Sequence, residues 1–172
     1  GVPDEPHLAA CPRTRAALEH VDMATIDGLC PNAMFSALAP HTEIPPHTGE
    51  TNARLVVHLP LIVPEKCTYR VGYEHREWKV GEILVFDDTL EHMARNDSDE
   101  IRVVLIFDIW NPLIPVAERE MVRTLATAAR TRLRARWPPP APETPSSRAG
   151  CPCPCARPPW RRARRRCRSW AW

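Results

Sequence analysis

The chain has 172 residues and a formal net charge of +2, a length that suits one domain with its own hydrophobic core. No apolar run reaches the ~18 residues that a membrane-spanning helix needs, so we expect no transmembrane segment. The seven cysteines are an odd number without a disulfide framework, which favours a reducing, cytoplasmic location. A processed or truncated N-terminus is expected, because the chain does not begin with Met.

The composition of residues 137–172 differs from that of the rest. This segment holds nine Pro, eight Arg, four Trp and a single acidic residue, so it carries +7 and leaves −5 for residues 1–136. Without a helix or strand period, it is predicted to be a disordered Pro/Arg/Cys-rich tail. We weighed a thiol metal site, nonspecific binding of nucleic acid or anionic membrane by the Arg run, and a non-native reading frame. We expect no specific nucleic-acid partner.

The chain begins with an expected arm at residues 1–10, followed by a short helix over 12–20 that opens on Pro12. A change to a β pattern follows, with turn signals between short apolar runs, which is typical of a sandwich or barrel. The runs predicted as strands are 34–39, 54–63, 69–73, 82–87 and 101–110. Residues 1–136 are therefore expected to form one mainly β domain, with its β core at about 33–114.

A closing helix is predicted over residues 115–136. Pro115 stands at its start, Glu118 and Glu120 suit its N-terminal end, and several Arg suit its C-terminal end.

Three of the seven histidines lie beside predicted strands, namely His47, His58 and His92. His47 opens the sequence His-Thr-Gly before one strand and His92 follows another strand, so both imidazoles could bind one metal ion. A non-haem iron site usually adds a carboxylate two residues after the first His, and Gly49 stands there. From the residues alone, a two-His site and two unrelated loop histidines both stay open, and Glu50 and Asp88 are weak candidates for a third ligand.

An arginine inside an apolar strand is a second signal. Arg102 is the second residue of the run IRVVLIFDIW, where a charged side chain is uncommon unless it is paired. Its guanidinium could hold a carboxylate, and it could also be an edge residue that faces water. His58 interrupts the run VVHLPLIV, either as a core His or as a second group for a dicarboxylate, and Ser36 could add a hydroxyl.

Three motifs follow one another along the chain: PHTGETNARLVVHLPLIVP at 46–64, EWKVGEILVFDDTLEH at 77–92 and NDSDEIRVVLIFDIWNP at 96–112. In their order and spacing they resemble the aspartyl/asparaginyl β-hydroxylase family, over residues 11–114 or about 60% of the chain. The chain looks like a compact bacterial-type member.

The resemblance implies a jelly-roll, cupin-like double-stranded β-helix with flanking helices, and an enzyme that uses Fe(II), 2-oxoglutarate and O2. By position, His47 and His92 match the metal ligands of a site without a carboxylate, which accounts for Gly49. Ser36, His58 and Arg102 match the residues that hold 2-oxoglutarate; Arg102 is thus also counted with the catalytic residues. Either Asp87 or Asp88 could orient His92.

The resemblance leaves the substrate less defined. By default it implies the β carbon of Asp or Asn in a peptide or protein, with Arg54 as a substrate contact. Val56, however, stands where the animal enzyme has an Arg that grips the acidic side chain. A lipid acyl chain of the lipid A type and a free amino acid are alternatives within the enzyme class. A non-catalytic cupin-like binding domain is the alternative of another class.

Overall fold

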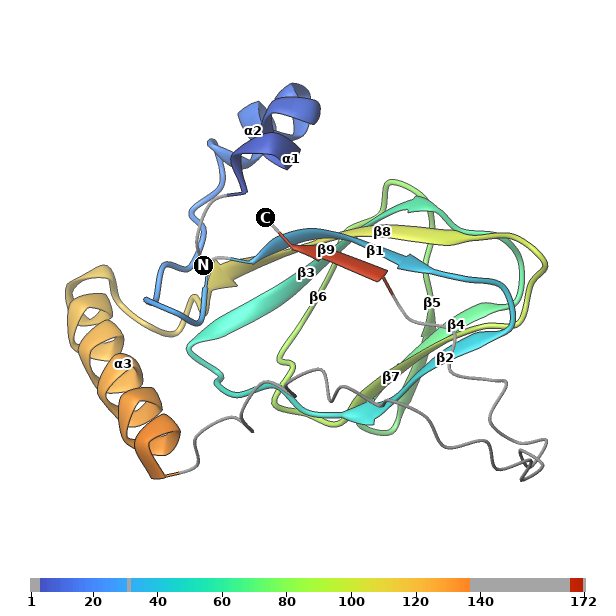
Figure 1. Cartoon of the computed structure of the whole chain (residues 1–172). Helices are drawn as coiled ribbons and strands as arrows, with labels where there is room; N and C mark the ends of the chain where they lie inside the picture. Colours follow the sequence, from blue (N-terminus) through green and yellow to red (C-terminus); the bar gives the residue numbers. More distant parts are fainter. Residues whose placement is uncertain (1–3, 31, 137–167, 172) are drawn as a thin grey trace, which may run out of the picture.

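The computed structural model describes residues 4–30, 32–136 and 168–171. Two antiparallel β-sheets face each other (Figure 1), one with the strand order β6-β3-β8-β1-β9 and one with the order β2-β7-β4-β5. The strands are β1 (Ala33–Leu38), β2 (Thr42–His47), β3 (Arg54–Ile62), β4 (Cys67–Val71), β5 (Glu74–Glu77), β6 (Leu84–Phe86), β7 (His92–Asn96), β8 (Arg102–Trp110) and β9 (Arg168–Ala171).

The strand order is that of a jelly roll. From β1 to β8 the chain crosses repeatedly between the two sheets, so that β1 pairs with β8 and β2 pairs with β7. The longest pairing joins β3 to β8, both of nine residues. This arrangement confirms the predicted double-stranded β-helix.

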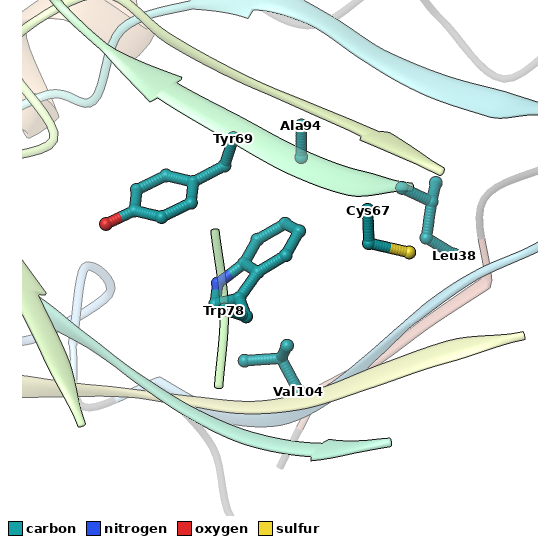
Figure 2. Close-up of a cluster of buried hydrophobic side chains, with 6 residues drawn as sticks. All are labelled: Leu38, Cys67, Tyr69, Trp78, Ala94 and Val104. Carbon is teal, nitrogen blue, oxygen red and sulfur yellow. The ribbon is translucent and has the colours of Figure 1, made fainter. Parts of the chain in front are cut away.

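The space between the sheets is filled by a cluster of buried side chains (Figure 2). Tyr69 and Trp78 stack within it, with ring centroids 5.0 Å apart. Their partners come from both sheets, because inward and outward side chains alternate along each strand. The other buried members are Leu38, Cys67, Ala94 and Val104.

Helices lie outside the sandwich (Figure 1). The helices α1 (Glu5–Ala10) and α2 (Pro12–Leu18) precede the sheets, and Leu18 packs on the cluster that covers the outer face of the larger sheet. The 3-10 turn η1 (Val116–Glu118) leads into α3 (Arg119–Arg136), as predicted for the closing helix. In the described part of the chain no helix is long and apolar enough to cross a membrane.

The structure corrects the expected arm, because residues Glu5–Ala10 are helical. The Asp4 side chain caps this helix by accepting from the His7 backbone N–H at 3.4 Å. Pro6 stands in the first turn of this helix, where its missing N–H costs nothing.

Three strands had no apolar pattern from which to predict them: β2, β5 and β7. Two prolines interrupt β2 next to a register shift, and all four residues of β5 are exposed. These strands lie in the smaller sheet. Their extended conformation is determined by pairing with neighbouring strands and not by a periodic pattern of apolar residues in their own sequence.

The predicted tail is also corrected at four residues. Arg168–Ala171 form β9, which pairs with the edge strand β1, whereas residues 137–167 and 172 lie outside the described residues. An edge strand offers unpaired N–H and C=O groups, so a segment without β periodicity can still add to it. The thiols of the metal site that was weighed for the tail, Cys151, Cys153 and Cys155, lie outside the described residues.

Candidate active site

Two predicted metal ligands face each other across neighbouring strands. His47 ends β2 and His92 begins β7, and the two residues are register partners in the smaller sheet. Their ring centroids are 4.1 Å apart. A register shift between Ile44 and His47, at the two prolines that cannot donate ladder hydrogen bonds, sets the end of β2 opposite His92. The structure therefore brings together the two residues that the sequence predicts as ligands.

The hydrogen bonds of the two rings select their tautomer. The Nδ1 atom of His47 lies 2.8 Å from the Pro45 carbonyl oxygen, and the Nδ1 atom of His92 lies 2.9 Å from that of Leu90. A carbonyl only accepts, so each Nδ1 carries a proton and each neutral ring keeps its Nε2 lone pair. Burial lowers the pKa of His92 below its ordinary value, which keeps the ring neutral.

This donor set fits a transition-metal ion that accepts imidazole. Among the described residues no group of three or more His, Cys, Asp and Glu could surround an ion, so the candidate donors in this part of the chain are the His pair. The expected role of Asp87 or Asp88 in orienting His92 is not what the structure shows, because the Leu90 carbonyl holds that ring. Asp87 instead accepts from the Thr89 backbone N–H and hydroxyl.

The predicted cosubstrate residues lie together in the larger sheet. Arg102 on β8 is 1% exposed, and its Nη1 donates to the Ser36 hydroxyl at 3.2 Å and the Ser36 carbonyl at 3.1 Å, both on β1. The guanidinium carbon lies 4.7 Å from the Trp78 ring centroid, which favours a cation over its face. Arg102 is therefore an inward-facing cation and not an edge residue in water.

His58 on β3 completes this group. Its Nδ1 accepts from the Trp78 indole N–H at 3.2 Å, so Nε2 must carry the proton of the neutral ring. Burial, with further effects of Arg102 and His92, lowers the pKa of His58 to about 3. A neutral N–H donor and a guanidinium thus share one buried space, and both suit a carboxylate.

Phe86 connects the two halves of the site. Its ring centroid lies 5.3 Å from that of His92 and 5.1 Å from that of His58. Val56 pairs with Phe86 across the strands and, two residues from His58, faces the same interior. The wall between the His pair and the Arg102 group is therefore apolar.

The proposed substrate contact, Arg54, lies inside the protein. Its Nη2 is 2.8 Å from Oδ2 of Asp88 and its Nη1 is 3.1 Å from Oδ1 of Asp108, and its side chain is 9% exposed. Two internal ion pairs therefore stand where the sequence predicts a contact with substrate. Asp88, a weak candidate ligand, is engaged by this arginine, and the exposed Glu50 pairs with Arg130 on α3 at 3.4 Å.

Two residues of this arrangement were not predicted from the sequence. Trp78 fixes His58 and packs on Arg102, and Asp108 pairs with Arg54. Asp108 could have been found by the reasoning applied to Arg102, because it is a charged residue inside the apolar strand β8. Trp78 follows a polar strand, and nothing in its local sequence indicates its partners.

Comparisons with known proteins identify the family of the chain. A sequence profile described as Aspartyl/Asparaginyl beta-hydroxylase matches residues 1–112. The chain belongs to this family. Its members include the mouse aspartyl/asparaginyl beta-hydroxylase, 41% identical over 86 residues, which are 49% of this chain and 12% of that protein. The ornithine lipid ester-linked acyl 2-hydroxylase of Rhizobium tropici is 41% identical over 116 residues, which are 66% of this chain and 39% of that protein.

A third family relative, aspartate beta-hydroxylase domain-containing protein 2 of Xenopus tropicalis, is 33% identical over 133 residues, which are 76% of this chain and 36% of that protein. The matches thus span between 12% and 39% of these three relatives. Among solved structures, the TT1209 protein of Thermus thermophilus is 20% identical with a TM-score of 0.40, over 52% of this chain and 82% of that one. A cupin domain of an Enterobacter cloacae transcriptional regulator is 14% identical with a TM-score of 0.41, over 48% of this chain and 84% of that one.

Proposed function

We propose that this protein is an Fe(II)- and 2-oxoglutarate-dependent dioxygenase that hydroxylates an unactivated C–H bond. The observation that carries the proposal is the placement of two facing imidazoles, His47 and His92, next to a buried group that contains a guanidinium and an imidazole N–H, with Phe86 between them. A hydroxylase activity agrees with the family to which the chain belongs.

His47 and His92 would hold the iron through Nε2, since their Nδ1 atoms are engaged by backbone carbonyls. When bound, Fe(II) supplies O2 activation, with conversion of 2-oxoglutarate to succinate and CO2. Two protein ligands leave more coordination positions open than three do, and these are available to a chelating cosubstrate and to O2.

The far carboxylate of 2-oxoglutarate would be held by Arg102 and the Nε2–H group of His58. Ser36 orients the guanidinium through its hydroxyl and carbonyl oxygens. Because His58 stays neutral at physiological pH, it donates to the anion without adding a second buried charge. The burial of this group keeps water out and strengthens its contact with the carboxylate.

For the substrate, the β carbon of an Asp or Asn residue in a peptide or protein is the first candidate, by analogy with the aspartyl/asparaginyl hydroxylases. A lipid acyl chain is the second candidate, and a specific observation favours it. Val56 is 7% exposed on the interior face of β3, so the wall beside Phe86 offers contact to methylene groups and no charge for a carboxylate. The Rhizobium relative, by its name, hydroxylates an acyl chain.

The test is substrate-linked succinate release. The protein is loaded with Fe(II) without oxygen, then given 2-oxoglutarate, O2 and, separately, Asp/Asn peptides, free amino acids, ornithine lipid and lipid A. We expect succinate and a product with one added oxygen atom from one of these classes. His92→Ala is expected to lose roughly 100-fold or more of the activity, whereas His75→Ala on the exposed strand β5 keeps it. Absence of succinate, with wild type and His92→Ala alike, would identify a non-catalytic binding domain.

A further inference from the structure

A chain of buried charges lies behind the His pair. Arg54 bridges Asp88 at 2.8 Å and Asp108 at 3.1 Å, and these three residues are 7%, 7% and 2% exposed. Asp108 is anchored in turn, because its Oδ2 accepts from the Asn32 backbone N–H at 3.0 Å and side-chain amide at 2.7 Å. The guanidinium is therefore held by β8, and it fixes the Asp88 carboxylate.

The Asp88 carboxylate lies directly against Gly49. A Cβ atom added to Gly49 would overlap the carboxylate carbon and both oxygens of Asp88. Gly49 is not among the residues with positive φ, so its backbone conformation is open to other residues. Space, and not backbone freedom, therefore requires glycine here. The Gly49 N–H also donates to the Asp88 carbonyl oxygen at 2.6 Å, which ties the two loops together.

One oxygen of Asp88 is held and the other is not. Oδ2 accepts from Arg54, whereas Oδ1 is buried and has no hydrogen-bond partner in the described part of the chain. A buried carboxylate oxygen in this state is costly, so a strong contact must keep the side chain in place. Arg54 supplies that contact.

We propose that Arg54 is a positioning residue: by bridging Asp88 to Asp108, it keeps the Asp88 carboxylate over Gly49, in the space that a third protein ligand of the metal would need. The two-His donor set is then enforced by packing as well as by the absence of a side chain at position 49. The part that concerns the metal rests on the proposed function, whereas the packing of Asp88 against Gly49 does not.

The first test uses the metal-free protein. Gly49→Ala is expected to lower Tm by about 5–10 °C, because the added methyl group displaces the carboxylate. In an Asp88→Ala background the same change is expected to lower Tm by less than about 2 °C. In the matched Asp87→Ala background, which leaves the buried carboxylate in place, the full loss should remain. If Gly49→Ala lowered Tm equally in the wild-type, Asp88→Ala and Asp87→Ala backgrounds, the proposal would be overturned.

The second test asks whether Arg54 holds the carboxylate. Arg54→Lys keeps the positive charge but cannot bridge two carboxylates through a planar fork, so Asp88 can shift. We expect the Gly49→Ala loss in Tm to fall by half or more in this background. Arg70→Lys is the control, since Arg70 pairs with Glu91 on the same loop at 2.7 Å and should leave the loss unchanged. An undiminished loss with Arg54→Lys contradicts the positioning role.

The third test uses Co(II) as the metal probe. Gly49→Asp combined with Asp88→Ala provides a carboxylate as third ligand and the space for it, so Co(II) should bind at least about 10-fold more tightly than to Asp88→Ala alone, with a changed visible spectrum. Gly49→Asp alone should show no gain. An equal gain with Asp88 in place would overturn the steric argument. Failure of the wild type to bind Co(II) would contradict the proposed metal site. The Tm measurements would still test the packing of Asp88 against Gly49, because they use the metal-free protein.

Discussion

The two halves of the site are built in different ways. His47 is exposed and His92 is half-buried, on two paired strands of the smaller sheet, and local backbone carbonyls two residues away orient both rings. Ser36, His58 and Arg102 are buried in the larger sheet and are fixed by side chains distant in the sequence. The half that is proposed to bind the metal, called the rim below, is thus set by local geometry, whereas the half that is proposed to bind the cosubstrate, called the buried half below, is set by tertiary packing.

This difference separates what each half contributes to the proposed reaction. A metal ion bound at the rim would be open to solvent. The buried half holds a cation and a neutral imidazole away from solvent, so a change there is expected to affect both stability and affinity for an anion. Substitutions in the buried half should therefore alter the Km for 2-oxoglutarate, whereas those at the rim should alter metal affinity.

The largest effect is expected from Arg102→Ala. Loss of a buried, charge-assisted contact costs about 3 kcal/mol, which corresponds to a roughly 100-fold rise in the Km for 2-oxoglutarate. Initial-rate kinetics at saturating Fe(II) measure it. Arg95→Ala, which removes an exposed arginine paired with Asp97, should leave the Km unchanged. An unchanged Km in Arg102→Ala would show that the buried half does not bind the cosubstrate.

A smaller effect is expected from pH, through His58. Its pKa is lowered from 6.5 to about 3 in the folded state, so below pH 6.5 the unfolded chain takes up a proton that the folded chain does not. Stability therefore falls as pH falls. The free energy of unfolding of the metal-free protein should drop by about 2 kcal/mol between pH 7 and pH 5, as measured by urea denaturation. His58→Gln should flatten this dependence, and His75→Gln should not; parallel curves for all three proteins would contradict a neutral buried His58.

The smallest effect is expected from Trp78→Phe. This change removes the indole N–H that fixes the His58 tautomer and costs about 1 kcal/mol, or roughly a 5-fold rise in the Km for 2-oxoglutarate. Tyr69→Phe is the matched control, because it alters the same aromatic cluster without removing the donor to His58. Equal Km values for the two variants would show that the tautomer is not controlled by Trp78.

Much of the fold could be predicted from the sequence, because the strands of the larger sheet are runs of apolar residues, a composition that is typical of buried strands. The runs 54–63 and 101–110 were predicted as strands and form β3 and β8, and Pro115 opens the segment that becomes the closing helix. Three of the four strands of the smaller sheet (β2, β5 and β7), the first helix and the pairing of β9 were not predicted. Their sequences are polar or Pro-rich, and their neighbours in space determine their structure.

For the site, the sequence alone determined which residue types are available for the proposed chemistry. It showed His47 and His92 beside strands, Arg102 inside an apolar run, and glycine where a carboxylate is usual. Only the tertiary structure decided which groups meet. It placed Arg54 between Asp88 and Asp108, set the Asp88 carboxylate over Gly49, and gave His58 its Trp78 donor. A local pattern encodes the period of a strand and the burial of its residues, but not the partner that lies across the sheet or the sandwich.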